Sequence, residues 1–259
     1  MKISLITVSY NSDKTIEKTF NSVRIQTYSN VEYIVIDGNS SDNTLSIIKK
    51  NQDIISKWIS EKDKGIYDAM NKGIGLATGD IIGILNSDDF YFDKNVLKKV
   101  ADCFNKYKVD SVYSDLIYVN KDKLDKIVRF WKSGKYKRSN FLYGWMPAHP
   151  TFFVKNEVYK KYGNFDLTIS SAADYEFMLR VLFKYRITSK YINFVSVKMR
   201  SGGNSNSSLL ARIKGNVQDR YAWKKNKIKP YFFTLLLKPL RKIPQYFKYP
   251  RNLNISFFV

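Results

Sequence analysis

Short apolar runs, each ending in a polar cluster, alternate with segments of helical periodicity over the first third of the chain. The apolar runs favour strands at residues 3–10, 31–36, 54–60 and 79–85. The intervening segments favour helices from a cap at Ser12 or Asp13 to about Ile25, over 43–51, and over 66–77. Runs rich in Ile and Val are typical of buried parallel strands. We therefore expect a parallel sheet whose strands are joined by right-handed helical crossovers.

The pattern is less regular after residue 90. Residues 132–146 are basic, aromatic and rich in turn formers, so they are expected to form a mobile loop. The remaining segments favour helices at 93–106, 172–185 and 209–225, and strands at 111–119, 126–131, 150–154 and 187–199. The strands at 111–119 and 126–131 flank a polar turn, which predicts an antiparallel pair.

The tail from Pro230 onward interleaves aromatic and aliphatic residues with Lys and Arg. Apolar and basic residues at helical spacing are typical of a helix that lies in the plane of a membrane surface. A helix packed against the body of the protein, with its basic face in water, fits the same pattern. Both interpretations stay open at this point.

The composition narrows the choice of partners and compartment. The 259 residues carry a net charge of +21, which favours an anionic partner such as nucleic acid, an anionic membrane or a phosphorylated substrate. The single Cys103 excludes an intrachain disulfide and indicates a reducing compartment. No signal peptide is visible, and no stretch approaches the roughly 20 apolar residues of a membrane span. We expect a cytoplasmic protein, soluble or peripherally bound.

Polar clusters follow the predicted parallel strands at Tyr10-Asn11, Asp37, residues 61–65 and Asp88-Asp89. The carboxyl ends of parallel strands meet at one edge of a sheet, so these side chains should converge there. A Tyr ring can flank a base, a carboxylate can accept its N–H, and two carboxylates can hold a divalent cation on a diphosphate. A solvated turn is the alternative for Asp88-Asp89 taken alone. Neither GxxxxGK[ST] nor GxGxxG occurs, which argues against P-loop and dinucleotide chemistry.

Four blocks in this order and spacing resemble the donor-binding half of family 2 glycosyltransferases with a GT-A fold: Ile3–Asn11, Tyr33–Thr44, Ser60–Gly79 and Leu85–Asp89. The third block is most similar to a bacterial subgroup that builds polysaccharide repeat units. The resemblance implies an α/β GT-A fold, in which helices flank a Rossmann-like mixed sheet, over residues 1–205. It divides that domain into a nucleotide-binding half, 1–90, and an acceptor half, 91–205. A basic, aromatic, helical extension, 206–259, lies outside it.

The resemblance implies a role for each residue of the donor site. Asp37 would bind the uracil imide, and Tyr10 would line the base pocket. Asp88 and Asp89 fall on the family's DxD-type motif. Asp89 would be the more direct ligand of a Mn²⁺ or Mg²⁺ ion. Asp88 would contact the metal and the ribose or sugar.

Asp63 and Asn71 fall in the segment that usually touches the nucleotide and the donor sugar. A helix cap or a surface charge is the alternative for both.

The acid that opens the late helix usually serves as the general base in this family. This sequence departs from the usual Glu-Asp pattern, because Ala173 replaces the first acid while Asp174 and Arg180 remain. The base is therefore assigned to Asp174, with Glu176 as the fallback. A helix-capping role for Asp174 is compatible with that assignment.

Three further residues are candidates for contacts with the acceptor or the diphosphate. His149 is the only histidine, and the resemblance implies that its segment faces the donor diphosphate or the acceptor; a structural role is the alternative. Trp145 offers a stacking face for an acceptor sugar, or packs in the core. Arg200, beside Gly202-Gly203, offers a bidentate fork for phosphate, or belongs to an ordinary surface loop.

The resemblance implies an inverting transferase that moves a sugar from a nucleotide diphosphate, most often UDP, to a glycan hydroxyl. The acceptor would be lipid-linked, at the inner face of the cell membrane, in bacterial surface polysaccharide synthesis. A sugar nucleotidyltransferase is an alternative, but its Gly-rich phosphate loop is missing after the first strand. A non-catalytic nucleic-acid binder would leave the Asp clusters unexplained, so no nucleic acid is expected as a partner.

Overall fold

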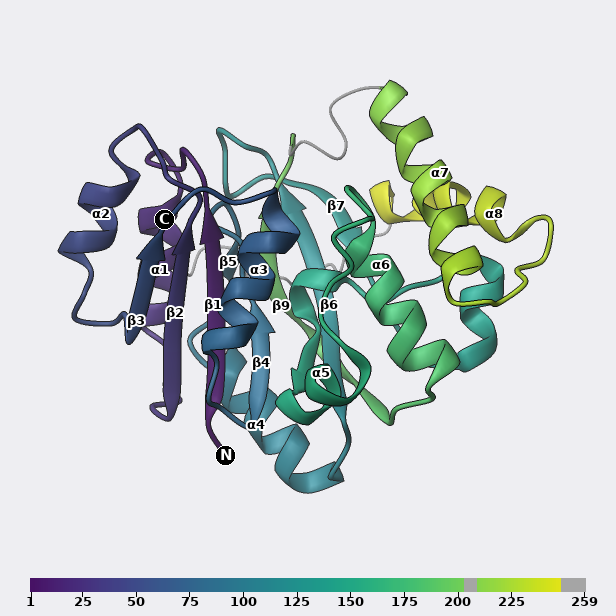
Figure 1. Cartoon of the computed structure of the whole chain (residues 1–259), viewed down its shortest axis with the longest axis horizontal. Helices are drawn as coiled ribbons and strands as arrows, with labels where there is room; N and C mark the ends of the chain where they lie inside the picture. Colours follow the sequence, from purple (N-terminus) through teal and green to yellow (C-terminus); the bar gives the residue numbers. More distant parts are fainter. Residues whose placement is uncertain (203–208, 248–259) are drawn as a thin grey trace.

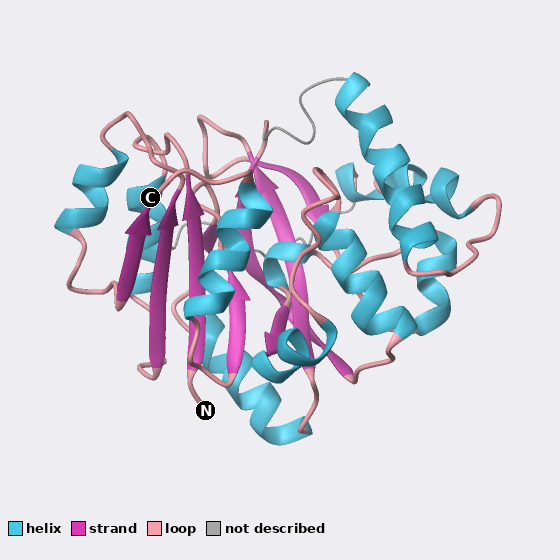
Figure 2. Cartoon of the chain, viewed as in Figure 1, coloured by secondary structure: helices cyan, strands magenta, loops and turns pink. Residues whose placement is uncertain are grey.

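A computed structural model describes residues 1–202 and 209–247. In this part of the chain nine strands form one mixed sheet, in the order β3-β2-β1-β4-β8-β6-β9-β5, with β7 paired to β6. Helices cover both faces of the sheet (Figure 1, Figure 2). The predicted mixed α/β architecture is therefore confirmed.

The first half of the sheet is parallel. Its strands are β1 (Ile3–Ser9), β2 (Val31–Asp37), β3 (Lys57–Ser60) and β4 (Ile81–Ile84). The connecting helices are α1 (Ile16–Arg24), α2 (Thr44–Lys50) and α3 (Ile66–Leu76). The register pairs Ser9 with Asp37 and Asp37 with Ser60, so these polar residues lie side by side at the carboxyl edge.

The second half of the sheet is mixed. The short β8 (Phe153–Lys155) runs antiparallel between β4 and the long β6 (Ser111–Val119). Strand β9 (Ser189–Arg200) lies parallel to β6, whereas β7 (Ile127–Trp131) and β5 (Phe90–Tyr91) are antiparallel to β6 and β9 respectively. The helices are α4 (Val96–Tyr107), α5 (Asn156–Tyr162) and α6 (Ala173–Met178), which continues as the π-helical η3 (Leu179–Lys184).

Residues 132–146 differ from the mobile loop expected from their composition. They contain the 3-10 helix η1 (Arg138–Tyr143), and a second one, η2 (His149–Thr151), follows. Phe141 and Trp145 are buried, with ring centroids 5.4 Å apart. Burial of these aromatic rings orders the segment, although the polar and basic residues around them are typical of a loop.

The C-terminal segment packs against α6, η1 and β7, at the end of the molecule away from β3 (Figure 1). It comprises α7 (Leu209–Lys225), α8 (Thr234–Leu240) and η5 (Ile243–Tyr246). Trp223 Nε1 donates to the hydroxyl of Tyr175 at 2.9 Å, and Lys238 pairs with the buried Asp219 at 2.6 Å. The predicted boundary between 205 and 206 lies outside the described residues.

Several element ends differ from expectation. Helix α4 begins at Val96 rather than at residue 93, and β8 begins at Phe153 rather than at residue 150, because η2 comes first. Helix α1 begins at Ile16 rather than at a Ser12 or Asp13 cap, because residues 12–15 form a turn first. Strand β3 begins at Lys57 rather than at residue 54. No helix within the described ranges is both long enough and apolar enough to cross a bilayer.

Candidate active site

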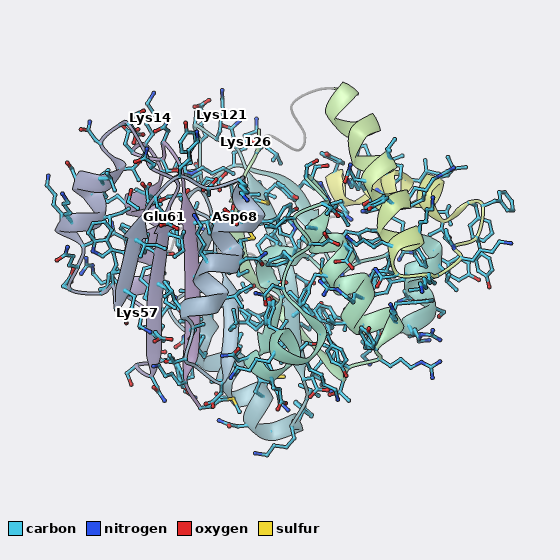
Figure 3. The ribbon with its side chains drawn as sticks, in the orientation of Figure 1. Lys14, Lys57, Glu61, Asp68, Lys121 and Lys126 are labelled. Carbon is cyan, nitrogen blue, oxygen red and sulfur yellow. The ribbon has the colours of Figure 1, made fainter. Side chains whose placement is uncertain are left out.

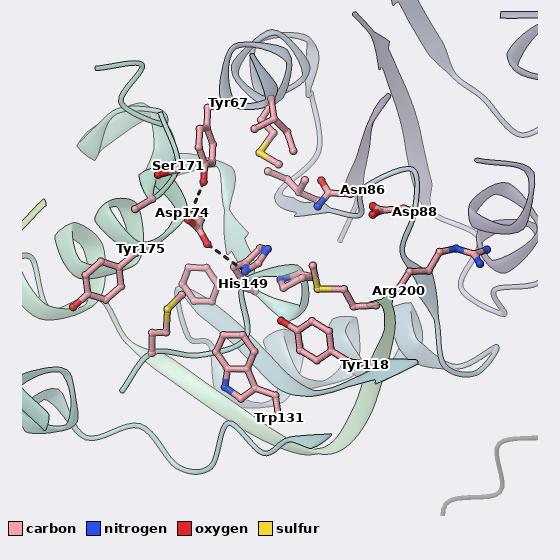
Figure 4. Close-up of a pocket in the computed structure, with 18 of the residues that line it drawn as sticks. Tyr67, Asn86, Asp88, Tyr118, Trp131, His149, Ser171, Asp174, Tyr175 and Arg200 are labelled. Carbon is pink, nitrogen blue, oxygen red and sulfur yellow. Dashed lines mark hydrogen bonds and ion pairs between the residues drawn. The ribbon is translucent and has the colours of Figure 1, made fainter. Parts of the chain in front are cut away.

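A cavity of about 2230 Å³ opens at the carboxyl edge of the parallel strands. Its walls come from the loops after β1 and β4, from α3 and α6, and from the C-terminal segment. A small-molecule site typically encloses roughly 300–1,000 Å³, so this cavity has room for two ligands. Figure 4 shows that Asp88 and Arg200 lie on one side of it, and Tyr67 and Asp174 on the other.

The turn after β4 presents the predicted acidic pair. The amide of Asp89 donates to the carbonyl of Asn86 at 3.0 Å. The hydroxyl of Thr19, from α1, donates to the backbone carbonyls of Ser87 and Asp89 at 3.0 and 2.7 Å. A helix on one face of the sheet therefore fixes the backbone of this turn.

This turn holds oxygen atoms that lack partners. Asp89 is fully buried, and among the described residues neither of its carboxylate oxygens has a hydrogen-bond partner, nor has the side-chain oxygen of Asn86. Burial, and next the charge of Asp88, raise the pKa of Asp89 well above its ordinary value. Burial also raises the pKa of Asp88, against the opposing charges of Arg200 and His149.

These oxygens fit a hard divalent cation. Nowhere in residues 1–202 or 209–247 do three His, Cys, Asp or Glu side chains group closely enough to hold a metal by themselves. Mg²⁺ and similar ions are often held by one or two carboxylates together with substrate phosphates. The turn therefore suits a cation that arrives with a diphosphate.

The predicted base-binding residues divide between the cavity and the layer behind it. Tyr10 and Asp63 line the cavity, and Tyr10 is 65% exposed. Gly38 lies against both, because a Cβ there would be 2.5 Å from Asp63 Oδ2 and 3.4 Å from the Tyr10 ring. Asp37 is instead fully buried and accepts hydrogen bonds from Ser9, Ser40 and Ser60. Its contact with a base stays a prediction.

Asp174 lies at the start of α6 and lines the cavity. The hydroxyl of Tyr67 donates to Asp174 Oδ1 at 2.9 Å, and His149 Nδ1 lies 3.2 Å from Asp174 Oδ2 (Figure 4). Burial, and next the charge of Asp174, raise the pKa of Tyr67 well above its ordinary value, so the phenol stays protonated. The carboxylate is thus held at both oxygens in a partly exposed position.

The fallback base lies in a different environment. Glu176 is 3% exposed, pairs with Arg180 at 3.1 Å and accepts a hydrogen bond from Asn226 at 2.9 Å. Both of its oxygens are engaged, and it does not contribute to the cavity wall in the described residues. Of these two acids, Asp174 is the one that lines the cavity, and its role as the base stays a prediction.

The other predicted residues take mixed positions. The amide of Asn71 exchanges two hydrogen bonds with the backbone of Phe165, at 2.8 and 3.0 Å, as a structural residue would. Trp145 reaches the cavity wall but is 6% exposed and donates to the carbonyl of Ser133 at 2.6 Å. Arg200 lines the cavity near the acidic pair and donates to the carbonyl of Lys121 at 3.4 Å. Gly203 lies outside the described residues.

The sequence patterns do not single out Tyr67, Asn86 or the C-terminal wall of the cavity. Tyr67 and Asn86 lie inside two of the motif blocks, so their positions alone could have identified them as candidate site residues. Nothing in the sequence places residues 238–246 at the cavity.

Basic side chains surround this edge of the molecule. Lys14, Lys121 and Lys126 lie at the edge where the parallel strands end (Figure 3). Lys72, from α3, pairs with Glu61 at 2.8 Å. A cavity that is lined by both acidic residues and cations, such as Asp88, Lys14 and Arg200, suits an anionic ligand that carries a metal.

Residues 4–163 match the family described as glycosyl transferase family 2. The chain belongs to this family. The glycosyltransferase is 33% identical over 180 residues to a protein described as an uncharacterised glycosyltransferase of Mycobacterium tuberculosis, and the match covers 69% of this chain and 68% of that protein. It is 26% identical over 213 residues, 79% of each chain, to a PGL/p-HBAD biosynthesis glycosyltransferase of Mycobacterium bovis.

Solved structures share the fold of this glycosyltransferase. Residues 1–349 of TarS from S. aureus, solved with UDP-GlcNAc, match with a TM-score of 0.68 and 20% identity over 87% of this chain and 66% of that chain. The chain covers 43% of a longer TarS structure. The mannosyltransferase PcManGT from Pyrobaculum calidifontis, solved with GDP-Man and Mn²⁺, matches with a TM-score of 0.65 and 16% identity over 91% of this chain and 68% of that chain. The predicted family and GT-A fold are therefore confirmed.

Proposed function

We propose that the protein transfers a sugar from a nucleotide diphosphate sugar, with UDP as the nucleotide, to a hydroxyl of a glycan acceptor with inversion at the anomeric carbon. One observation carries this proposal. A cavity large enough for two ligands has a cation-ready acidic turn on one side and the held carboxylate of Asp174 on the other. That arrangement separates the leaving group from the base, as direct displacement requires.

The donor occupies the side next to the parallel strands. Tyr10 and Asp63 lie at the base end, with Asp37 behind them and Asn71 in the supporting helix. Asp89 and Asp88 would hold a divalent cation, which would neutralise charge on the diphosphate. The complexes of TarS with UDP-GlcNAc and of PcManGT with GDP-Man and Mn²⁺ support this placement by analogy of fold.

The acceptor hydroxyl lies against Asp174. Its oxygen forms the new bond to the anomeric carbon as its proton passes to Asp174. The bond between that carbon and the diphosphate breaks, and its electron pair leaves with the diphosphate. Tyr67 and His149 hold the carboxylate oxygens in position for this transfer. Trp145 and Arg200 serve the acceptor and the diphosphate, respectively.

The C-terminal segment supports a lipid-linked acceptor at the inner face of the cell membrane, in bacterial surface polysaccharide synthesis. Its large exposed apolar side chains include Phe232, Leu236, Leu240, Ile243 and Phe247. Lys and Arg residues lie between them, and residues of the same segment form one wall of the cavity. An anionic bilayer fits a surface that is apolar and basic at once.

Replacing Asp174 by Asn tests the proposal. The variant keeps the size of the side chain but cannot accept the proton, so transfer should fall at least a thousandfold while UDP binding, measured by calorimetry with Mn²⁺, stays unchanged. Glu157→Gln, at an exposed carboxylate on α5, is the matched control and should transfer normally. Normal turnover by Asp174→Asn would contradict the assignment of the base.

A further inference from the structure

Arg129, in the middle of β7, is a buried cation without a carboxylate partner. The residue is 4% exposed and lines the cavity. Its Nε donates to the neutral side-chain oxygen of Gln245 at 2.7 Å, and its Nη2 has no hydrogen-bond partner. No acid of the described residues forms an ion pair with it. Burying an unpaired charge destabilises a protein, so a cation in this position is expected where an anionic ligand binds.

Aromatic rings hold the guanidinium in place. Its central carbon lies 4.5 Å from the ring centroid of Tyr118, 5.2 Å from that of Trp131 and 5.7 Å from that of Tyr246. Figure 4 shows the Tyr118 and Trp131 rings at the cavity wall opposite Tyr67. Such rings stabilise and orient a cation but do not neutralise it. The guanidinium is thus preorganised and keeps its full charge.

The cavity is polarised by charge. Its donor side carries the acids Asp13, Asp42, Asp63 and Asp88 together with the cations Lys14 and Arg200, whereas the side formed by β7 and the C-terminal segment carries Arg129, Lys132, Arg241 and Lys242. Among the described residues, that second side also carries the acid Asp219, which is paired with Lys238. A ligand on the second side therefore meets an excess of positive charge.

This cationic side adjoins the proposed base. The guanidinium of Arg129 lies against the ring of Tyr118. Tyr118, Arg129 and Asp174 all line the same cavity. A single ligand can reach the last two, with an anionic group at Arg129 and a hydroxyl at Asp174.

We propose that Arg129 is the centre of an anion subsite that binds a phosphate or diphosphate group of the acceptor. A guanidinium matches phosphate geometry with paired donors, and the additional cations suit a group with more than one negative charge. The subsite fixes the acceptor so that the sugar attached to the phosphate presents its hydroxyl to Asp174. This inference rests on the proposed function, because it places the acceptor in the same cavity.

Calorimetry on the full chain, saturated with UDP and Mn²⁺, tests the subsite with farnesyl diphosphate and inorganic pyrophosphate as probes. Saturation fills the donor side, so a further diphosphate must bind elsewhere. The native protein should bind the probes, and Arg129→Met should weaken that binding at least tenfold, with Arg129→Lys between the two. Arg138→Gln is the matched control and should bind normally, because Arg138 also stacks on a ring and donates to a neutral carbonyl but lies outside the cavity wall.

Gln245→Glu separates binding from folding. The new carboxylate would lie at the 2.7 Å position and pair with Arg129 internally, so the thermal midpoint should rise while probe binding is lost. Tighter binding of farnesyl diphosphate than of pyrophosphate identifies a lipid-borne phosphate, and equal affinities identify the phosphate group itself; both support the subsite.

Native affinity in Arg129→Met, absence of probe binding to the UDP-saturated native protein, or a stronger competition by methyl glucuronide than by pyrophosphate would overturn the proposal. Failure of UDP itself to bind would instead refute the proposed function.

Discussion

The buried carboxylate of Asp89 lowers the stability of the folded protein. Its carboxylate is fully buried and its two oxygens lack partners, although buried polar groups are generally hydrogen-bonded. Burial and the neighbouring Asp88 raise its pKa, which means that the folded chain resists the charged form. A residue that destabilises the folded protein in this way is expected at a binding site, where the ligand supplies the interaction that the protein lacks.

Asp89→Asn should therefore stabilise the protein while it removes metal-dependent UDP binding. We expect the free energy of unfolding to rise by about 1–3 kcal/mol at neutral pH. Because the folded-state pKa of Asp89 lies above the ordinary value of 3.8, the native chain loses stability as the pH rises above that value, so the gap should widen from acid to neutral pH. Chemical denaturation at several pH values measures the gap, and calorimetry with and without Mn²⁺ measures UDP binding.

The control for Asp89→Asn is Asp102→Asn, at an exposed i,i+4 ion pair with Lys98, which should change the stability by less than about 0.5 kcal/mol. A Mn²⁺ dependence of UDP binding that survives in Asp89→Asn would show that the cation is held elsewhere.

Tyr67 is a positioning residue for Asp174. Its protonated hydroxyl fixes Asp174 Oδ1 at 2.9 Å, and its ring packs against Phe165, 5.6 Å between centroids. Tyr67→Phe keeps the packing and removes the hydrogen bond, so kcat should fall about tenfold while the KM for the donor stays constant. Steady-state kinetics measure both constants. A rise in donor KM with an unchanged kcat would instead assign Tyr67 to donor binding.

At the scale of elements, the donor half of the fold could be predicted from the sequence and much of the acceptor half could not. Strands β1, β2 and β4 are continuous apolar runs, and the polar residues that follow them must meet at one edge, so the convergence of Tyr10 and Asp88 follows from local pattern and topology. The apolar periodicity of residues 172–185 predicts the helix that carries Asp174, whereas the role of Asp174 comes from the family resemblance and stays a prediction.

Long-range packing explains what the sequence left hidden. Trp145 and η1 are ordered by contacts with Tyr113 and Phe183, which lie far away in the chain. Arg129 becomes a buried cation because Gln245 and Tyr246 cover it. A local pattern of basic and aromatic residues does not show which of them pack against the body, so it could not predict that residues 238–246 line the cavity.

The junction between η1 and α8 depends on Gly144. Its φ is +75°, and a Cβ there would lie 2.5 Å from the backbone nitrogen of Lys238. Gly144→Ala should therefore destabilise the protein by about 2–4 kcal/mol, since backbone strain and a clash with α8 add together. Gly134→Ala is the matched control, because Gly134 has a φ of +69° but nothing within 4 Å of the added carbon, and it should show the strain alone. Thermal unfolding compares the two, and equal losses would mean that α8 is not held at this point.

At the scale of the whole molecule, the net charge of +21 and the exposed apolar residues are both consistent with docking to an anionic membrane. Cations at the rim and in the cavity attract anionic ligands to the site, and those of the C-terminal segment lie beside exposed aromatic side chains. Each Lys or Arg close to an anionic bilayer contributes about 1 kcal/mol, and a buried Phe or Leu about 1.5–3 kcal/mol. The segment that forms the acceptor wall would then bring the cavity to the membrane where a lipid-linked acceptor resides.

Membrane docking is best tested with point variants, because a truncation after Lys229 would also remove Lys238 and leave Asp219 as a buried, unpaired charge. Phe232, Leu236 and Phe247 are 90%, 64% and 78% exposed, so changing all three to Ser removes apolar contact area without opening the core. Binding to phosphatidylglycerol vesicles, measured by co-sedimentation, should fall at least tenfold, and added salt should weaken the residual binding. The matched control is Leu167→Ser, at a leucine that is 49% exposed outside this segment, and it should sediment like the native protein. Unchanged sedimentation of the triple variant, or equal binding to neutral phosphatidylcholine vesicles, would place the acceptor in solution rather than in a bilayer.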